Sequence, residues 1–138
     1  TFVRSFGSEG SEDGQFDRPF DVSVGPDGSI AVLDCPGRVQ IFDGEGRFVK
    51  KIGSRGDGPG QFEDAQSVAH GAGGEIIVSD NNRNDVQVFS GEGELLQIIG
   101  KGGDSDVDFA VVKGLAADAS GRLFVLQHFR GCRVCMLS

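Results

Sequence analysis

The chain has 138 residues, a formal net charge of −8 and a hydrophobic share of 38%, which is ordinary for one small soluble domain. No apolar run approaches the roughly 20 residues that a membrane-spanning helix needs, which excludes a helical membrane protein. Twenty-three glycines against four prolines indicate many tight turns.

The first segment, residues 1–7, aligns with the ends of two later repeats. Phe2-Val-Arg-Ser-Phe6-Gly7 matches residues 48–53 and 95–100, which have the pattern of a last, outer strand. We therefore expect residues 2–6 to form an orphan outer strand, with Phe2, Val3 and Phe6 as its apolar residues. This strand has no sheet of its own in the sequence.

One whole repeat follows at residues 16–53. Its runs of Val, Ile and Phe have the length of strands and are too short for stable helices; they lie at residues 21–24, 30–34, 39–42 and 48–52. Asp27-Gly28 and Gly44-Glu-Gly46 separate them, and both residue types tolerate the positive φ of tight turns. The pattern predicts a four-stranded sheet.

The same pattern returns at residues 62–100 and 109–138. Phe16, Phe62 and Phe109 open the three repeats, with a period of 46 to 47 residues. A period of this length filled with four strands is typical of a propeller blade, and the three Phe residues are expected to fill the core between blades. The third repeat lacks only its outer strand.

This strand count predicts an assembly. Three blades are below the usual range of four to eight, and an arc would expose both open sides. The orphan strand at residues 2–6 is the type of strand that the third repeat lacks. We therefore expect a homodimer that closes a six-bladed ring by exchanging this strand; the alternative is that further blades lie in a longer parent chain.

The repeat resembles the NHL repeat of six-bladed β-propellers over nearly the whole chain. The resemblance rests on Gln15-Phe16-Asp17-Arg18-Pro19, Asp27-Gly28, Asp34 and Arg38-Val-Gln-Ile-Phe42, and on their second copies, with Gln127 departing from Asp34 and Asp80. The absence of Trp argues against WD-type blades. The fold expected is all-β, with three blades' worth of strands per chain.

The resemblance implies a function as well. NHL propellers of this appearance are found in tripartite-motif (TRIM) ubiquitin ligases, where they bind protein or RNA. It implies a non-catalytic interaction module, with substrate recognition for a ligase as its finer form and RNA binding as the alternative. A third branch, a metal-dependent lyase, uses several histidines, whereas this chain has only His70 and His128.

Charge favours a protein partner over RNA. The loops between repeats hold ten acidic and three basic residues. The acids expected to form this acidic face include Glu12, Asp13, Asp57, Glu63, Asp64, Asp104, Asp106 and Asp108. An acidic face repels phosphate, which supplies most nucleic-acid affinity, so we expect a partner such as a basic peptide.

The turns between second and third strands carry the RNA alternative. They supply cations and hydrogen-bonding groups near the axis, namely Arg38, Asn81, Asn82, Arg83, Asn84, His128, Arg130 and Arg133. The competing interpretation is that each Arg pairs with a neighbouring acid such as Asp34, Asp80 or Asp85. Asp34 and Asp80 are expected to brace their own turns.

Other chemistry has little support in the sequence. Cys35, Cys132 and Cys135 make an odd number, and the single C-x-x-C pair has no second pair, so we expect buried or loop thiols in a cytoplasmic protein. The run of Asp104, Asp106 and Asp108 lacks the later glycine and acid of a calcium loop. We expect no metal, no cofactor and no catalytic residues.

Overall fold

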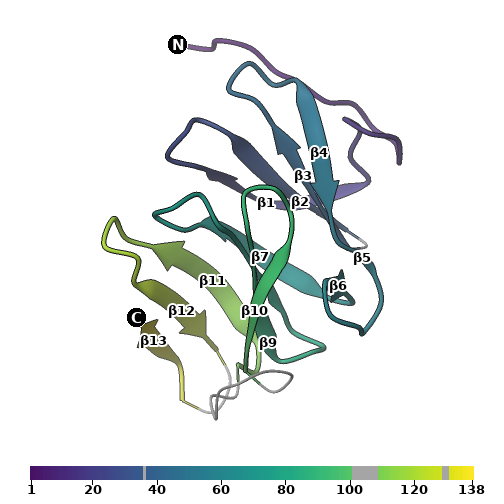
Figure 1. Cartoon of the computed structure of the whole chain (residues 1–138). Coiled ribbons are helices and arrows are strands. Elements are labelled where there is room, and N and C mark those ends of the chain that lie inside the picture. The colour runs from purple at the N-terminus through teal and green to yellow at the C-terminus, as the bar shows by residue number, and fades with distance from the viewer. Residues whose placement is uncertain (36, 101–108, 129–130) are drawn as a thin grey trace.

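The computed structural model describes residues 1–35, 37–100, 109–128 and 131–138, and these residues form strands and turns only. Two four-stranded sheets and one three-stranded sheet follow one another in chain order (Figure 1). Within this described part of the chain, no helix is long and apolar enough to cross a membrane. The predicted all-β fold is confirmed.

Each sheet is one predicted blade. Blade 1 consists of β1 (Arg18–Val24), β2 (Ile30–Cys35), β3 (Arg38–Phe42) and β4 (Phe48–Ile52). Blade 2 consists of β7 (Ala65–His70), β8 (Ile76–Asp80), β9 (Asp85–Phe89) and β10 (Leu95–Gly100). Blade 3 consists of β11 (Val112–Ala117), β12 (Leu123–Gln127) and β13 (Arg133–Leu137). The short parallel strands β5 (Ser54–Arg55) and β6 (Gln61–Phe62) lie in the loop between blades 1 and 2.

The three blades share one register. Neighbouring strands in each blade are antiparallel, and the first strand of each has a register shift at the equivalent position, after Pro19, Ala65 and Val112. Val22, Val68 and Leu115 stand opposite Val32, Val78 and Val125 in the three sheets. Gly28 and Gly74 have φ of 84° and 90°, as the predicted turns require. The repeat in the sequence is therefore also a repeat in the structure.

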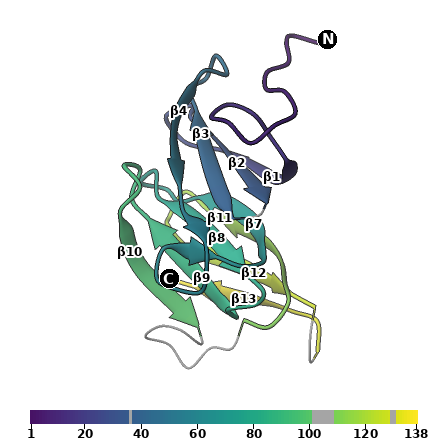
Figure 2. The ribbon, with the colours of Figure 1, turned by 90° about the vertical axis from the view of Figure 1, so that its right-hand side faces the viewer.

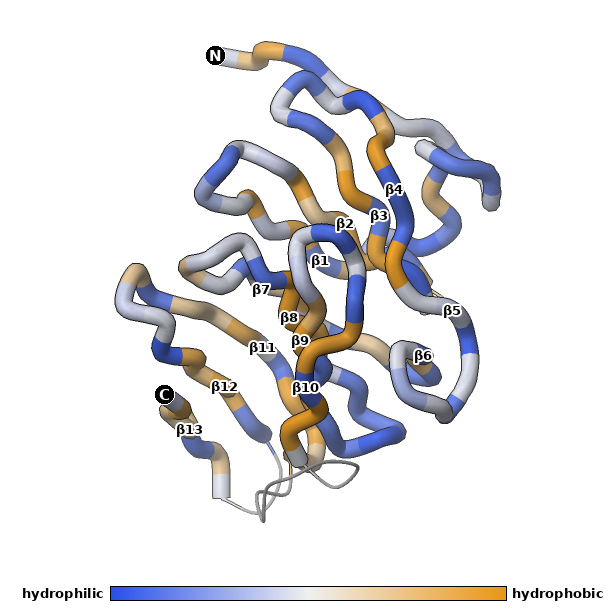
Figure 3. Tube along the Cα trace, viewed as in Figure 1, coloured by the Kyte–Doolittle hydropathy of each residue, from blue (hydrophilic) through white to orange (hydrophobic). Residues whose placement is uncertain are grey.

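The core lies between blades rather than within one of them. One apolar cluster joins Leu33 and Val39 of blade 1 to Val68 and Val78 of blade 2. A second cluster joins blade 2 to blade 3. Figure 3 shows apolar residues along the strands and polar ones at the turns.

The phenylalanines that open the repeats have the predicted position. Phe62 and Phe109 are fully buried, one in each of the two clusters, which confirms their role between blades. Phe16 is only half-buried. The reason is that the side of blade 1 on which Phe16 lies has no neighbouring blade among the described residues.

The N-terminal segment differs from its prediction. Residues 2–6 form no strand, although they lie along the outside of blade 1 (Figure 2). Phe6 packs on Phe42 with ring centroids 5.0 Å apart, and Arg4 forms an ion pair with Glu45 at 2.7 Å. A strand needs a neighbouring backbone to satisfy its N–H and C=O groups, and in the described residues the segment has none assigned to it. Phe2 and Val3 are about four-fifths exposed.

Candidate functional site: an acidic loop face

Two kinds of connection meet at one end of the blades. The loops at residues 8–17 and 53–64 lead into blades 1 and 2, and the turns after β2 and β8 lie against them. Asn81 donates its backbone N–H to the carbonyl of Asp64 at 3.0 Å. We call this end, made of the two loops and these turns, the loop face.

Two buried carboxylates hold the loops in place. Asp34 accepts the backbone N–H groups of Asp17 and Arg18, the shorter at 2.7 Å. Asp80 accepts those of Glu63 and Asp64. Both side chains are fully buried. Asp80 also braces its own turn through the backbone N–H groups of Asn82 and Arg83, and Asp34 braces the turn after β2 through the Arg38 side chain.

Two buried glutamines also hold the loops in place, and the sequence analysis did not identify them. Gln40 accepts the N–H of Gly14 at 2.8 Å and donates to the carbonyl of Gln15 at 2.6 Å. Gln87 repeats this arrangement with Gly60 and Gln61, both at 2.8 Å. The recurring Val-Gln-x-Phe was the available signal, because a polar residue that recurs inside an apolar strand needs a buried partner.

Two arginines of the turns, Arg38 and Arg83, are held in ion pairs. Arg38 bonds Asp34 at 3.0 Å and donates to the carbonyls of Ser11 and Gln15. Arg83 bonds Asp85 at 2.9 Å and donates to the carbonyl of Asp57. Their side chains are 17% and 10% exposed, and each carboxylate partner is fully buried. For Arg38 and Arg83, the structure favours the interpretation in which each Arg neutralises a nearby acid.

The other candidate side chains of these turns do not converge on one site. Asn81 uses Oδ1 to accept the N–H of Val112, which ties the turn to blade 3. Asn82 is exposed and lies 3.4 Å from Glu63, and Asn84 is half-buried with φ of 54°. His128 and Arg133 are exposed, and Arg133 donates to Gln127. Arg130 lies outside the described residues.

The acidic side chains of the loops point mainly to solvent. Glu12, Asp13, Asp57 and Glu63 are exposed, and Asp64 is half-buried. Lys51 pairs with Asp13 at 3.2 Å in an exposed contact, which is weak in water. Asp104, Asp106 and Asp108 lie outside the described residues. The described part of the loop face is thus acidic, because Arg38 and Arg83 are paired with buried carboxylates and the exposed acids outnumber the exposed Arg55.

Burial changes the titration of three groups. Burial raises the pKa of Asp85, whose Oδ1 has no hydrogen-bond partner, against the opposing effect of Arg83. Burial lowers the pKa of His70, which lies between blades 1 and 2 with Nδ1 2.9 Å from Ser23 Oγ. Burial also raises the pKa of the Cys35 thiol. These groups lie apart in the sheets and form no catalytic constellation.

Neither a metal cluster nor a disulfide is found in the described residues. No group of three His, Cys, Asp or Glu side chains lies close enough together there to hold a metal ion. Cys35 is buried, Cys132 is exposed and Cys135 is half-buried, all as free thiols.

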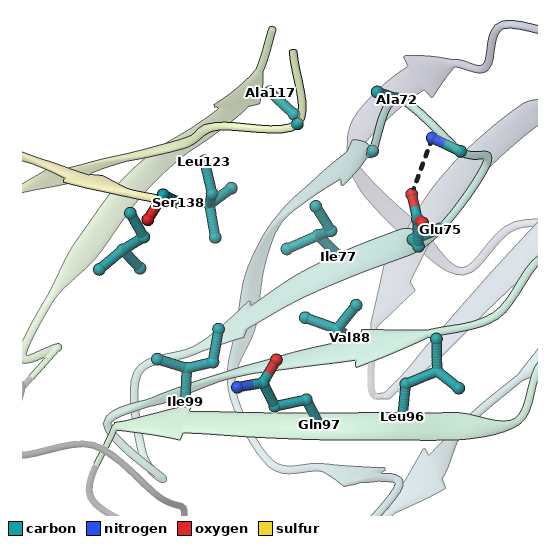
Figure 4. A pocket seen from close by; sticks show the side chains of 14 residues that line it. Ala72, Glu75, Ile77, Val88, Leu96, Gln97, Ile99, Ala117, Leu123 and Ser138 are labelled. Atoms are coloured by element: carbon teal, nitrogen blue, oxygen red, sulfur yellow. Dashed lines mark hydrogen bonds between the residues drawn. The ribbon is translucent and has the colours of Figure 1, made fainter. Parts of the chain in front are cut away.

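One cavity lies away from the loop face. It has a volume of about 580 Å³ and opens between the outer parts of blades 2 and 3 (Figure 4). Ile77, Val88, Leu96 and Ile99 line it from blade 2, and Leu123 and Ser138 from blade 3. A smaller cavity of about 290 Å³ on the loop face is lined by Asp34, Arg38 and Arg55, among others.

Comparison with solved structures decides the fold. The chain is similar to hydrazine synthase of Kuenenia stuttgartiensis (TM-score 0.65, 11% identity, 94% of this chain and 33% of that one). The chain has the β-propeller fold. It is also similar to virginiamycin B lyase of Staphylococcus aureus (TM-score 0.65, 12% identity, 87% and 38%) and to the WD40 β-propeller domain of Doa1 (TM-score 0.52, 17% identity, 72% and 30%).

These likenesses extend to the fold alone. The chain spans about a third of the length of these propellers, which include enzymes and a WD40 domain. No family model matches the sequence, and no curated protein matches it. The NHL resemblance therefore rests on the repeat pattern of the sequence.

Proposed function

We propose that this chain is a non-catalytic interaction module whose loop face binds a basic segment of a partner protein. The observation that carries the proposal is the difference in exposure between the acidic and the basic side chains on this face. Glu12, Asp57 and Glu63 are exposed, whereas Arg38 and Arg83 are largely buried against Asp34 and Asp85. A partner approaching the face therefore meets negative charge.

The same observation weighs against RNA binding. An RNA-binding surface needs cations that are free to contact phosphates. Arg38 and Arg83 already donate to carboxylates and to loop carbonyls, so moving them to a ligand would leave Asp34 and Asp85 buried and unpaired. The NHL resemblance extends the proposal: in a tripartite-motif ubiquitin ligase, the loop face would recognise the substrate.

The test is binding of a labelled Lys/Arg-rich peptide to the purified chain, followed by fluorescence anisotropy. We expect binding that weakens as salt rises from 50 to 500 mM, because exposed charges are screened. The double variant Asp57→Lys, Glu63→Lys should weaken binding at least tenfold. Glu92→Lys, in the turn between β9 and β10 at the opposite end, is the control and should bind like the unmodified chain.

Binding of a single-stranded RNA to the same chain tests the RNA-binding alternative. We expect it to bind more weakly than millimolar at physiological salt. Micromolar binding of RNA that is lost in Arg133→Glu, with no binding of the basic peptide, would overturn the proposal in favour of the RNA alternative.

A further inference from the structure

A histidine is buried at the contact between blades 1 and 2. His70 is the last residue of β7, is 8% exposed and belongs to a strand that lies beside β1 of blade 1 (Figure 1). Its Nδ1 is 2.9 Å from Oγ of Ser23 in β1, and its backbone N–H donates to the same oxygen at 3.1 Å. One hydroxyl group of blade 1 therefore binds His70 twice.

The directions of these hydrogen bonds place the ring proton. Because Ser23 Oγ accepts the backbone N–H of His70, Ser23 keeps one hydroxyl hydrogen, which it donates to Nδ1. The ring proton then lies on Nε2, which is 3.5 Å from Oγ of Ser29, and Ser29 donates its own hydroxyl to Asp27 at 2.7 Å. This arrangement uses a neutral imidazole.

The imidazole ring is closely covered by blade 1. A Cβ atom added at Gly25 would lie 2.7 Å from Cδ2 and 2.9 Å from Nε2 of His70, closer than real Cβ atoms approach. Glycine at this position therefore lets the ring pack against the backbone that follows β1. A ring covered in this way has little access to water, which disfavours its charged form.

Charged side chains occur on the elements around the ring. They are Asp21 of β1, Asp27 of the β1–β2 turn, Glu75 of the β7–β8 turn, Lys113 and Asp118 of β11 and the turn after it, and Asp34 and Asp80 at the loop-face ends of β2 and β8. Asp27 favours the protonated ring, but burial has the larger effect and lowers the pKa of His70. Asp21 is bound to Ser67 and Val68, and Asp118 is paired with Arg122.

This hydrogen-bonded network is found at only one of the two blade contacts in the described residues. The shared register places Ala69 of blade 2 at the position of Ser23, and Ala117 of blade 3 at the position of His70. Blades 2 and 3 therefore pack together without an equivalent of the Ser23–His70 pair. Since the fold itself does not need the pair, its presence between blades 1 and 2 calls for a separate role.

We propose that His70 makes the contact between blades 1 and 2 sensitive to protons. When Nδ1 takes up a proton, it and the His70 backbone both donate to Ser23 Oγ, and the Ser23 hydroxyl hydrogen loses its acceptor. A positive charge is also placed in a covered site. Acid therefore weakens the contact between the two blades, and loss of the same proton restores it. This contact is independent of the ligand at the loop face.

The sign of the pH dependence follows from the lowered pKa of His70. The unfolded chain takes up this proton near the ordinary value of 6.5, and the folded chain only at a lower pH. Above pH 6.5 the contribution to stability is complete, and it is lost as pH falls below that value. Asp85 acts in the opposite direction, because burial raises its pKa. The effect of His70 is therefore measured as a difference between variants at the same pH.

The first test is urea unfolding at pH 7.5 and pH 5.0 of the unmodified chain, His70→Asn and His128→Asn. Asparagine at position 70 keeps an acceptor near the place of Nδ1 but does not titrate, and the exposed His128 provides the matched control. Between pH 7.5 and 5.0 we expect the unfolding equilibrium constant to rise at least threefold more in the unmodified chain and His128→Asn than in His70→Asn. An equal rise in all three would overturn the proposal.

Nuclear magnetic resonance locates the effect without relying on a stable variant. The chain has two histidines, so their ring signals are readily told apart. We expect His70 to lack a proton on Nδ1 at pH 7.5 and to titrate below pH 6.5. Hydrogen-exchange protection of the His70 and Val68 amides, which bond blade 1, should fall at pH 5.0 more than that of Val112, which bonds Asn81 between blades 2 and 3. Titration at or above pH 6.5, or equal loss at both contacts, would contradict the proposal.

Ser23→Ala tests the partner of the ring. Blade 2 already has alanine at this position, so the fold accepts the change. Without the hydroxyl donor the neutral ring loses its hydrogen bond, and the pKa of His70 should rise toward its ordinary value. Ser67→Ala, which removes a bond to Asp21 across the same contact, is the control and should leave the His70 titration unchanged. An unchanged titration in Ser23→Ala would remove Ser23 from the proton-sensitive contact.

Discussion

At the scale of single residues, the chain uses the same side-chain types for opposite purposes. Asp80 is fully buried and accepts backbone N–H groups from Glu63, Asp64, Asn82 and Arg83. Glu63, one residue before Asp64, is exposed at the loop face. The buried acid fixes the shape of the loop, and the exposed acid sets its charge.

Asp80→Ala should lower the free energy of unfolding by about 3 kcal/mol, because four backbone N–H groups lose their acceptor. Urea unfolding followed by circular dichroism measures this loss. Glu92→Ala, on the exposed β9–β10 turn, is the control and should change stability by no more than about 0.5 kcal/mol. A loss below about 1 kcal/mol for Asp80→Ala would show that the loop does not depend on this carboxylate.

At the scale of elements, stability comes from the contact between adjacent blades. The core clusters combine residues from two blades each, and polar bonds cross the same boundary. Asp21 of β1 accepts the hydroxyl of Ser67 and the N–H of Val68 in β7. Each blade is therefore stabilised by its neighbour, as expected for a repeat architecture.

Phe62→Ala should lower the free energy of unfolding by about 3 to 5 kcal/mol, because it empties a fully buried site between blades 1 and 2. Phe16→Ala is the matched comparison, since Phe16 occupies the same repeat position. Its ring is only half-buried, so a smaller loss is expected. Equal losses in thermal or urea unfolding would contradict the assigned difference in packing.

At the scale of the whole molecule, neighbouring blades contact each other in chain order. One difference between the blades is that Gly114 and Ala116 occupy the positions of Asp21 and Ser23 in the first strand of blade 3. Blade 3 therefore lacks the polar side chains through which Asp21 and Ser23 of blade 1 bond blade 2.

The amino-acid sequence by itself determined the repeat and its fold. The 46 to 47 residue period, Gly28 and its equivalents in the turns, and short runs of Val and Ile predicted the strands, because these signals act over a few residues. The recurring Phe62 and Phe109 likewise predicted the core between blades.

Only the tertiary structure decided what the polar residues do. Arg38 had several acids within reach of its sequence position, and its bonds to Ser11 and Gln15 depend on how a loop more than twenty residues away is folded. The binding of the preceding loop by Gln40 and the lack of a strand at residues 2–6 were equally hidden. The physical reason is that hydrogen-bond partners and strand pairing are set by neighbours in space, whereas turns and strands are set by neighbours in sequence.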